Sequence, residues 1–488
     1  MLFNSLPFIF LFLPIALALF YAIARADHGF AAGFLALASL FFYGWWDIRY
    51  VSLLTASVCV NFMLSEAIVR NHSRSRTART IMIVAVAGNL ALLGYYKYTD
   101  FFTANLNVLA GAEWTMRKIV LPLGISFFTF TQIAFLVDTY RDIARERKFI
   151  HYLLFITYFP HLIAGPILHH AEMMPQFADP KPYRFTPERL AVGISLFIVG
   201  LAKKTICADG ISPVAQTVFG AARHGSLDLP HAWYGALAYT MQIYFDFSAY
   251  TDMALGISIM FGIYLPLNFN SPYKAASIVE FWRRWHMTLS RFLRDYLYIP
   301  LGGSRRSRSR RYVNLMITMV LGGLWHGAAW TYVIWGALHG LYLVINHGWT
   351  RLSGGKPAGR VSRMAGVLVT FLSVVIAWVF FRAADFASAI AMLKAMAGLD
   401  GLHSPAAPYV SNMQIACIPL LLGICWFVPN AYEMLGRFSP ALQNPASAKP
   451  WLSWRPNAWC AMGLGALGAL SLSQILSGAP SEFIYFQF

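Results

Sequence analysis

Long apolar segments recur along the chain from Leu2 to Leu476, and no long polar linker separates them. A helix needs about 20 apolar residues to cross the hydrocarbon core of a bilayer, where its backbone groups must be paired internally. The pattern therefore predicts an all-α polytopic membrane protein with one continuous membrane domain over residues 1–488. The predicted crossings are residues 6–24, 29–46, 50–69, 80–98, 119–140, 150–168, 189–206, 364–382, 412–428 and 458–477.

Two further apolar runs, residues 231–262 and 312–346, are too long for single crossings. The first carries Asp246 and Asp252 in its middle, and the second carries paired glycines just before His326. Each is expected to form a hairpin or a re-entrant pair, because irregular backbone is tolerated at membrane depth where it lines a cavity. We predict breaks between the two aspartates and at the glycines. The total is then about 11–13 transmembrane helices plus re-entrant segments.

Residues 278–296 place apolar and basic side chains at helical spacing. Aromatic and aliphatic residues form a narrow stripe at about 100° per residue, with the arginines and Glu280 opposite. This pattern is typical of an amphipathic helix lying in the membrane interface. Two functions stay open for it: an anchor that binds anionic lipid, or a cytoplasmic entrance whose arginines contact a phosphorylated acyl donor.

The composition agrees with this pattern. Of the residues, 58% are hydrophobic and 12% are charged, against roughly a quarter charged in soluble domains. A water-soluble fold is therefore excluded. The chain has 38 Lys and Arg against 21 Asp and Glu, a net charge of +17. In a polytopic protein this excess is expected in cytoplasmic loops next to anionic membrane lipid, and it does not indicate nucleic-acid binding.

Basic loops at Arg25, residues 70–79 and residues 141–148 predict that these parts of the chain are cytoplasmic and that the N-terminus lies outside. The pair Lys203–Lys204 and the basic stretch 274–311 are also expected in the cytoplasm. One apolar run separates these last two regions. A single crossing would place them on opposite sides of the membrane, which conflicts with a cytoplasmic location for both. We attribute the conflict to a hairpin or re-entrant pair within that run.

Two histidines are candidates for catalysis. His326 lies inside an apolar run between small residues, where an ionisable side chain usually faces the protein interior or a wet cavity. Neutral imidazole can take a proton from a hydroxyl that attacks a thioester. His286 lies at the border of the apolar stripe of residues 278–296 and can reach inward. A histidine that is merely hydrogen-bonded between helices is the alternative for each.

Other candidate groups are less distinctive. Asp246 and Asp252, with Tyr250 between them, form a polar cluster that should be hydrogen-bonded within the bundle. The cluster fits a structural hydrogen-bond network as well as it fits a substrate contact. The five cysteines are scattered without a close pair, which predicts neither a disulfide framework nor a metal site. Because no activated serine or cysteine motif is in view, direct transfer assisted by a general base is simpler than a covalent acyl-enzyme.

Six segments resemble motifs of the membrane-bound O-acyltransferase family, most closely its alginate O-acetylase branch. They are Tyr244–Met253, Phe281–Ser290, Phe292–Tyr296, Tyr298–Gly303, Leu324–Gly327 and Phe483–Phe488. The strongest motifs cover residues 240–346, and weaker similarity extends over the N-terminal spans. Motifs of this length, in this order, are far more specific than a single glycine-rich or histidine-containing triplet.

The resemblance implies a multi-span helical fold around a central cavity, with a catalytic histidine at His326 and a second functional histidine at His286. It implies acetyl-CoA or another acyl thioester as the donor, reached from the cytoplasm, with no permanently bound cofactor. Arg291 and Arg294 are expected to bind this donor. The residues expected to contact substrate are Asp246, Tyr250, Asp252, Trp282, Arg283, Arg284, Trp285 and Trp325.

The resemblance also implies a location in the bacterial inner membrane and an acceptor on the opposite face from the donor. An esterase-like periplasmic acetyltransferase and the polysaccharide export machinery are the expected partners, and the product is an O-acetylated exported polysaccharide such as alginate. The choice of acetyl as the transferred group comes from the resemblance, not from the hydropathy pattern.

Three alternatives stay open. The first is D-alanyl or other acyl transfer to a cell-wall polymer. The second is a proton-coupled transporter, because intramembrane His and Asp residues also form proton relays, although nothing indicates the internal duplication common in transporters. The third is a non-catalytic scaffold that recruits a periplasmic enzyme.

Overall fold

The computed structural model describes residues 1–114, 119–144, 146–223, 225, 227–305, 307–354, 359–404, 407–443, 451–478 and 481–484. The regular secondary structure within these ranges is helical, and they contain no strand, as the apolar pattern predicts. Arg145, in the predicted cytoplasmic cluster, and Arg306, in the basic stretch, lie outside the described residues. So do the last four residues of the terminal motif.

Five of the described helical stretches are long and apolar enough to cross a membrane unaided. They are α3 (Arg49–Arg70), α4 (Arg76–Ala110), the joined α9, η2 and α10 (Pro187–Ala222), α16 (Arg360–Arg382) and α20 (Ala458–Ser477). Shorter apolar helices are η1 with α1 (Phe8–Ala24), α2 (His28–Gly44), α17 (Phe386–Met396) and α18 (Asn412–Phe427). The protein is thus an all-α polytopic membrane protein.

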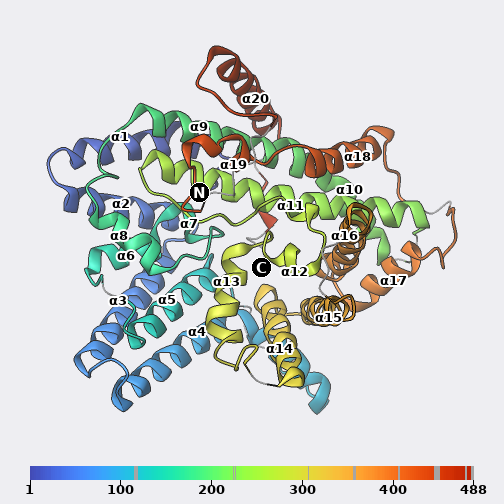
Figure 1. Cartoon of the computed structure of the whole chain (residues 1–488), viewed down its shortest axis with the longest axis horizontal. Coiled ribbons are helices and arrows are strands. Elements are labelled where there is room, and N and C mark those ends of the chain that lie inside the picture. The colour runs from blue at the N-terminus through green and yellow to red at the C-terminus, as the bar shows by residue number, and fades with distance from the viewer. Residues whose placement is uncertain are drawn as a thin grey trace.

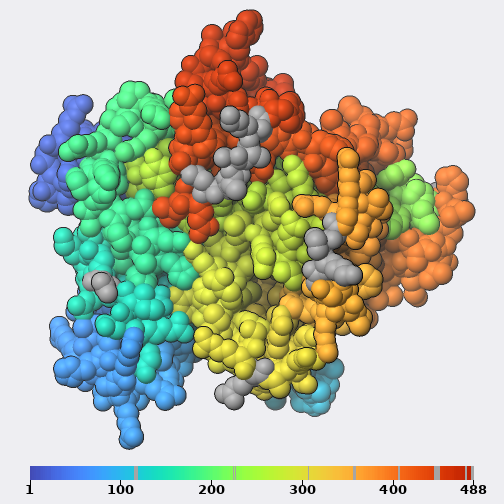
Figure 2. All heavy atoms as spheres, in the orientation of Figure 1, coloured from blue at the N-terminus to red at the C-terminus, as the bar shows by residue number. Residues whose placement is uncertain are grey.

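The segments around the centre of the chain also occupy the centre of the molecule. Helices α12, α13 and α14 lie between the N-terminal helices α3–α5 and the C-terminal helices α15–α17 (Figure 1). Figure 2 shows the same arrangement in atoms, with the yellow part of the chain bordered by blue and cyan atoms on one side and orange atoms on the other. The fold therefore surrounds the motif-bearing region with the less distinctive spans.

Helix α11 (Leu229–Met260) is continuous over 32 residues, so the predicted break between Asp246 and Asp252 is wrong. The reason lies in the preceding helical stretch, where Lys203 and Lys204 form the π-helical turn η2 (Lys203–Ala208) instead of a cytoplasmic loop. The Nζ atom of Lys204 lies 2.7 Å from Asp246 Oδ1, and that of Lys203 lies 2.6 Å from Asp252 Oδ2. These ion pairs compensate the buried carboxylates, so the helix can run through them without a break.

The predicted crossing 150–168 is also wrong as a single span. The segment forms α6 (Phe149–Thr157), α7 (Phe159–Leu162), an extended stretch and then α8 (His170–Ala178). Leu162 packs against Gly124 at the start of α5 (Ile125–Tyr140), whereas His170 Nδ1 lies 3.4 Å from Asp138 Oδ2 near its end. The segment therefore travels along α5 and returns to the level where it began. Because Lys203 and Lys204 lie inside a helical stretch and not in a loop, two crossings, the α9–α10 stretch and α11, then separate residues 141–148 from residues 274–311. Both basic regions can therefore lie on the same face, and the parity conflict is removed.

The second long run forms the expected hairpin of α14 (Arg308–His326) and α15 (Trp330–Leu352). Its break follows His326 and not the glycine pair before it. The glycines instead permit close packing, since a Cβ atom on Gly323 would lie 2.2 Å from the carbonyl oxygen of Tyr332. Small residues at helix contacts are typical of membrane proteins, because they let backbones approach closely.

Gly336 offers a direct test of this contact. A Cβ atom there would lie 2.3 Å from the carbonyl oxygen of Met319, and backbone cannot move aside as a flexible side chain can. We expect Gly336→Ala to destabilise the purified protein by about 1–3 kcal/mol, the usual range for overpacking. Gly348 lies on the same helix with open space around it, so Gly348→Ala is the matched control in a thermal unfolding assay. Equal melting of the two variants would contradict the packing argument.

Candidate active site

The predicted amphipathic helix 278–296 is interrupted. It consists of α12 (Ile278–Trp282), a turn, α13 (Met287–Leu293) and the π-helical η4 (Arg294–Tyr298). The turn ends at His286, whose φ of 42° is in the left-handed region. A neighbouring extended segment holds it, because Met287 N donates to the carbonyl oxygen of Asn268 at 3.0 Å and Asn270 N donates to that of Arg284 at 2.9 Å. The break buries His286 completely, whereas a continuous helix would leave it at the border of the stripe.

Asn268 also fixes the protonation of the His286 ring. The Oδ1 atom of Asn268 accepts from Thr288 N at 3.3 Å and from Thr288 Oγ1 at 3.0 Å, which identifies it as the amide oxygen. His286 Nδ1 lies 3.1 Å from this same atom. Because an amide oxygen can only accept, Nδ1 carries a proton, and in the neutral form of the ring Nε2 is then the unprotonated nitrogen.

His326 is the last residue of α14, and its backbone is held from α4. Lys97 Nζ donates to the carbonyl oxygens of Trp325 and His326 at 2.6 and 3.2 Å, and Tyr98 OH donates to that of Leu324 at 2.8 Å. The last carbonyls of a helix lack partners within the helix, and a cation at this end also complements the helix dipole. These bonds fix the position of the His326 backbone.

The structure brings the two predicted histidines together. The ring centroids of His286 and His326 lie 6.4 Å apart, and His326 is 3% exposed. Aromatic rings enclose the pair: the centroids of Trp325 and Trp335 lie 4.9 and 5.1 Å from that of His326. A third histidine, His339, is also buried, and its ring centroid lies 4.7 Å from that of Trp335. The motifs did not single it out.

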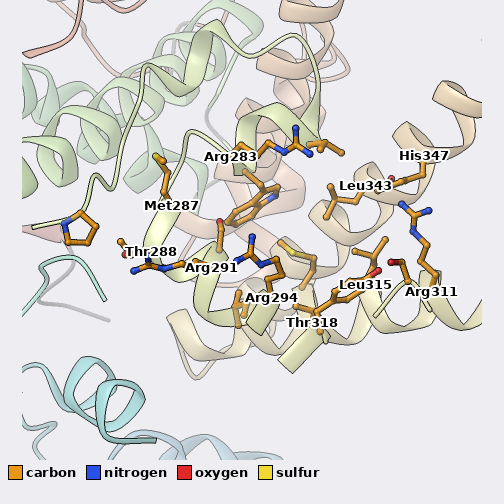
Figure 3. A pocket seen from close by; sticks show the side chains of 18 of the residues that line it. Arg283, Met287, Thr288, Arg291, Arg294, Arg311, Leu315, Thr318, Leu343 and His347 are labelled. Atoms are coloured by element: carbon orange, nitrogen blue, oxygen red, sulfur yellow. Dashed lines mark hydrogen bonds between the residues drawn. The ribbon is translucent and has the colours of Figure 1, made fainter. Parts of the chain in front are cut away.

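A cavity of about 670 Å³ lies between the interrupted segment and the hairpin, and we call it the arginine pocket. Four arginines line it: Arg283, Arg291, Arg294 and Arg311 (Figure 3). Arg291 pairs with both carboxylate oxygens of Glu172, at 2.5 and 2.7 Å, and Arg294 with Asp295 at 2.7 Å. Arg283 and Arg294 are exposed.

Arg311 is the arginine of this pocket that the sequence did not single out. It lies one turn into α14, and its position in a dense basic stretch hid it among arginines that face elsewhere. Its Nε atom is buried, and no described residue accepts a hydrogen bond from it. Arg284, which the sequence did single out, pairs with Glu280 at 2.8 Å and lies outside the pocket lining.

The pocket approaches both histidines. Met287 and Thr288, which directly follow His286, line it. Met319 lines it too, and it precedes His326 by about two turns of α14, or roughly 10 Å. Trp282 also lines the pocket, and its ring centroid lies 5.2 Å from that of His339.

A second cavity, of about 190 Å³, approaches His326 from another direction. It is lined by Ser126 and Phe127, among others, at the start of α5. Ser126 Oγ accepts from Lys97 at 3.3 Å, and the ring of Phe127 lies 5.6 Å from that of Trp325. The arginine pocket, by contrast, lies near the other end of α5, where Tyr296 OH donates to Asp138 at 2.6 Å. The two cavities therefore lie near opposite ends of α5, a helix roughly 24 Å long.

The remaining predicted site residues lie elsewhere. Asp246 and Asp252 are buried in their lysine pairs, and Asp252 also accepts from Tyr432 OH at 2.5 Å. The ring of Tyr250 lies 4.9 Å from that of Phe3. None of Asp246, Asp252 and Tyr250 lines either cavity. Trp285 is buried, and its ring centroid lies 5.0 Å from that of Trp378. Their contact with substrate stays a prediction.

The chain is similar to several known proteins. Residues 113–385 match the membrane-bound O-acyltransferase family. The chain is 43% identical to the peptidoglycan O-acetyltransferase of Helicobacter pylori, over 82% of this chain and 81% of that one. It is 37% identical to a probable alginate O-acetylase of Pseudomonas aeruginosa over the full length of both. A teichoic acid D-alanyltransferase of Bacillus subtilis is 29% identical over 55% of this chain and 71% of its own.

The chain belongs to the membrane-bound O-acyltransferase family, and it is an acyltransferase. This membership favours the enzymatic interpretation over the transporter and the scaffold.

Proposed function

We propose that this protein moves an acetyl group from a cytoplasmic acyl thioester, such as acetyl-CoA, to a hydroxyl of an exported polysaccharide, with His326 as the general base. One observation carries the proposal: an arginine pocket and a second cavity, both next to residues that contact the buried pair His286 and His326, lie near opposite ends of α5. Such an arrangement lets donor and acceptor meet without either crossing the membrane.

The charge distribution supports donor entry at the arginine pocket. Arg74 donates to the carbonyl oxygen of Arg141 at 2.7 Å, and the Arg141 guanidinium lies 5.6 Å from the ring centroid of Tyr296, beside the pocket. The pocket thus belongs to the face that carries the basic loops, which is the cytoplasmic face by the positive-inside rule. Arginines bind phosphate through charge-assisted hydrogen bonds. The buried Nε atom of Arg311 has no acceptor among the described residues and can donate to such a phosphate.

The proposed acyl transfer uses the two histidines. Neutral His326 takes the proton of the acceptor hydroxyl as its oxygen attacks the thioester carbonyl. The new ester bond forms, the carbon–sulfur bond breaks, and the thiolate leaves with the electron pair and takes up a proton. His286, whose ring is oriented by Asn268, has a supporting role in orienting donor or acceptor.

The names of the relatives bear on the acceptor. Relatives named as an alginate O-acetylase and a peptidoglycan O-acetyltransferase support an exported or cell-wall polysaccharide as the acceptor. An esterase-like periplasmic protein and the polysaccharide export machinery are the proposed partners on the acceptor side of the bacterial inner membrane. D-alanyl transfer is the second candidate, which the more distant teichoic acid D-alanyltransferases favour.

The proposed function is tested on the polymer and on the protein. Mild base should release acetate from the host's exported polymer, and deletion of this gene should remove that acetate. The purified full chain, reconstituted in vesicles, should consume labelled acetyl-CoA. Release of alanine would favour the second candidate. An unchanged ester content, together with no consumption of any acyl thioester, would rule out the acyl-transfer proposal.

The donor site makes a separate prediction. Arg283→Gln with Arg311→Gln should raise the apparent KM for acetyl-CoA about tenfold, because each change removes a hydrogen bond to a charged phosphate. The KM of the wild type should also rise more steeply with salt than that of the variant. Arg308 and Arg310 are exposed on the same basic stretch and do not line the pocket, so Arg308→Gln with Arg310→Gln is the control. Equal KM values for the two double variants would place the donor elsewhere.

A further inference from the structure

A large groove lies away from the histidines. It has a volume of about 1010 Å³ and runs between α1, α9 and α20. Its walls are mainly aliphatic and aromatic, and they include Ile9, Leu13, Leu17, Ile194, Ile198 and Leu472. Figure 1 shows α20 at the edge of the molecule, beyond α9. None of these residues takes part in the chemistry proposed above.

One end of the groove is basic. Arg25, His28 and Arg184 line it there, and both arginines are exposed. Tyr183 fixes this end, because its ring stacks on His28 at 4.6 Å and on Phe20 at 5.6 Å. None of the described lining residues is acidic.

Two acidic residues beside this end, Asp27 and Asp179, have partners of their own. The Asp27 carboxylate accepts from Phe30 N at 2.8 Å as the N-cap of α2, and Asp179 lies 3.8 Å from Lys181. Arg189 donates to the carbonyl oxygens of Lys181 and Arg184, which holds the turn that carries Arg184. The two groove arginines therefore present their charge to whatever occupies the groove.

We propose that the α1–α9–α20 groove binds one anionic glycerophospholipid from the leaflet on the basic face. Its phosphate would lie on Arg25 and Arg184, and its acyl chains would follow α1 toward Ile9. From Arg25 to Ile9 the helix spans roughly 24 Å, close to the ~20 Å depth of one leaflet with its head group. Basic sites between transmembrane helices on the cytoplasmic side are suited to such lipids.

The basic end favours a lipid head group over an apolar helix of another protein, because two exposed arginines line the groove there. A lipid would also contact α20, whose main contacts are with α9 and the adjoining turn η2. Gly468 and Leu472 of α20 form one wall and α1 forms the other, so a bound lipid would join the two helices.

The experiment uses the purified, delipidated full chain in a neutral detergent. Adding dioleoyl phosphatidylglycerol should raise the melting temperature by about 3 °C or more over the same amount of dioleoyl phosphatidylcholine, because a ligand of the folded state stabilises it. Native mass spectrometry should detect one retained phosphatidylglycerol. Arg25→Gln with Arg184→Gln should lose both effects, while it melts like the wild type in phosphatidylcholine.

The control is Arg360→Gln with Arg363→Gln, two exposed arginines at the start of α16 that do not line the groove. This variant should keep the full response to phosphatidylglycerol. Equal stabilisation by both lipids, or an undiminished response of the Arg25 and Arg184 variant, would overturn the proposal. Ala18→Trp, which fills the apolar part of the groove, gives a second test: it should abolish lipid retention although both arginines remain.

Discussion

Replacing His326 by glutamine should remove O-acetylation of the exported polymer. Glutamine is close to histidine in size and can hydrogen-bond, but its amide cannot take a proton from an attacking hydroxyl. General bases contribute typically 10²–10⁴-fold to a rate, and a loss in this range would leave no measurable product. The variant should still fold, because Lys97 holds this position through hydrogen bonds to the backbone carbonyl oxygens of Trp325 and His326, which the substitution keeps.

The measurement is the acetate released by mild base from polymer of cells that express each variant at the wild-type level. His403 is exposed and lies far along the chain from the motif residues, so His403→Gln is the control and should retain full acetylation. Wild-type acetylation in the His326→Gln strain would show that the base lies elsewhere. His339 would then be the next candidate to test.

Lys204→Met should destabilise the protein more than any other single change considered above. The side chain of Lys204 is 2% exposed, and its loss leaves the Asp246 carboxylate with Ile484 N, at 2.8 Å, as its remaining hydrogen-bond donor among the described residues. Removing one partner of a buried ion pair costs about 3–5 kcal/mol, because the other charge stays buried without compensation. Thermal unfolding and the amount of inserted protein would both report the loss.

The second variant separates structure from substrate binding. Lys204→Met with Asp246→Asn removes both charges, so much of the lost stability should return, since replacing a whole buried pair is often nearly neutral. If this double variant acetylates polymer, Asp246 acts through the fold; if it folds but is inactive, its predicted substrate role gains support. Lys394, exposed on α17, supplies the control Lys394→Met. A single Lys204→Met variant as stable as this control would contradict the ion-pair argument.

The sequence was informative where a pattern is local. Apolar runs predicted the polytopic helical fold, and the motifs led to two histidines that the structure places 6.4 Å apart. The stripe of residues 278–296 correctly indicated a segment rich in pocket-lining arginines. Its interruption could not be seen, because it depends on hydrogen bonds to Asn268 and Asn270, which lie outside the stripe.

The sequence did not predict the location and role of residues whose partners lie far away along the chain. Lys203 and Lys204 look like a cytoplasmic doublet until Asp246 and Asp252 are seen opposite them, more than forty residues later. Lys97 gave no signal at all, since nothing local shows that its ammonium group reaches the end of α14. Ion pairs and caps of this kind are set by the tertiary fold, not by periodicity.

The lysine–aspartate pairs between the α9–α10 stretch and α11 also bear on how the chain enters the membrane. Alone, the α9–α10 stretch would carry Lys203, Lys204 and Asp209 into lipid, with Asp209 pairing with Lys204 at 2.9 Å. Helix α11 alone would carry Asp246 and Asp252, and each unpaired charge near the bilayer centre costs about 2.5–3.5 kcal/mol. Together they neutralise one another through Lys203 with Asp252 and Lys204 with Asp246. During synthesis, the insertion machinery should therefore release the two helices into the bilayer as one hairpin, after the second has emerged from the ribosome.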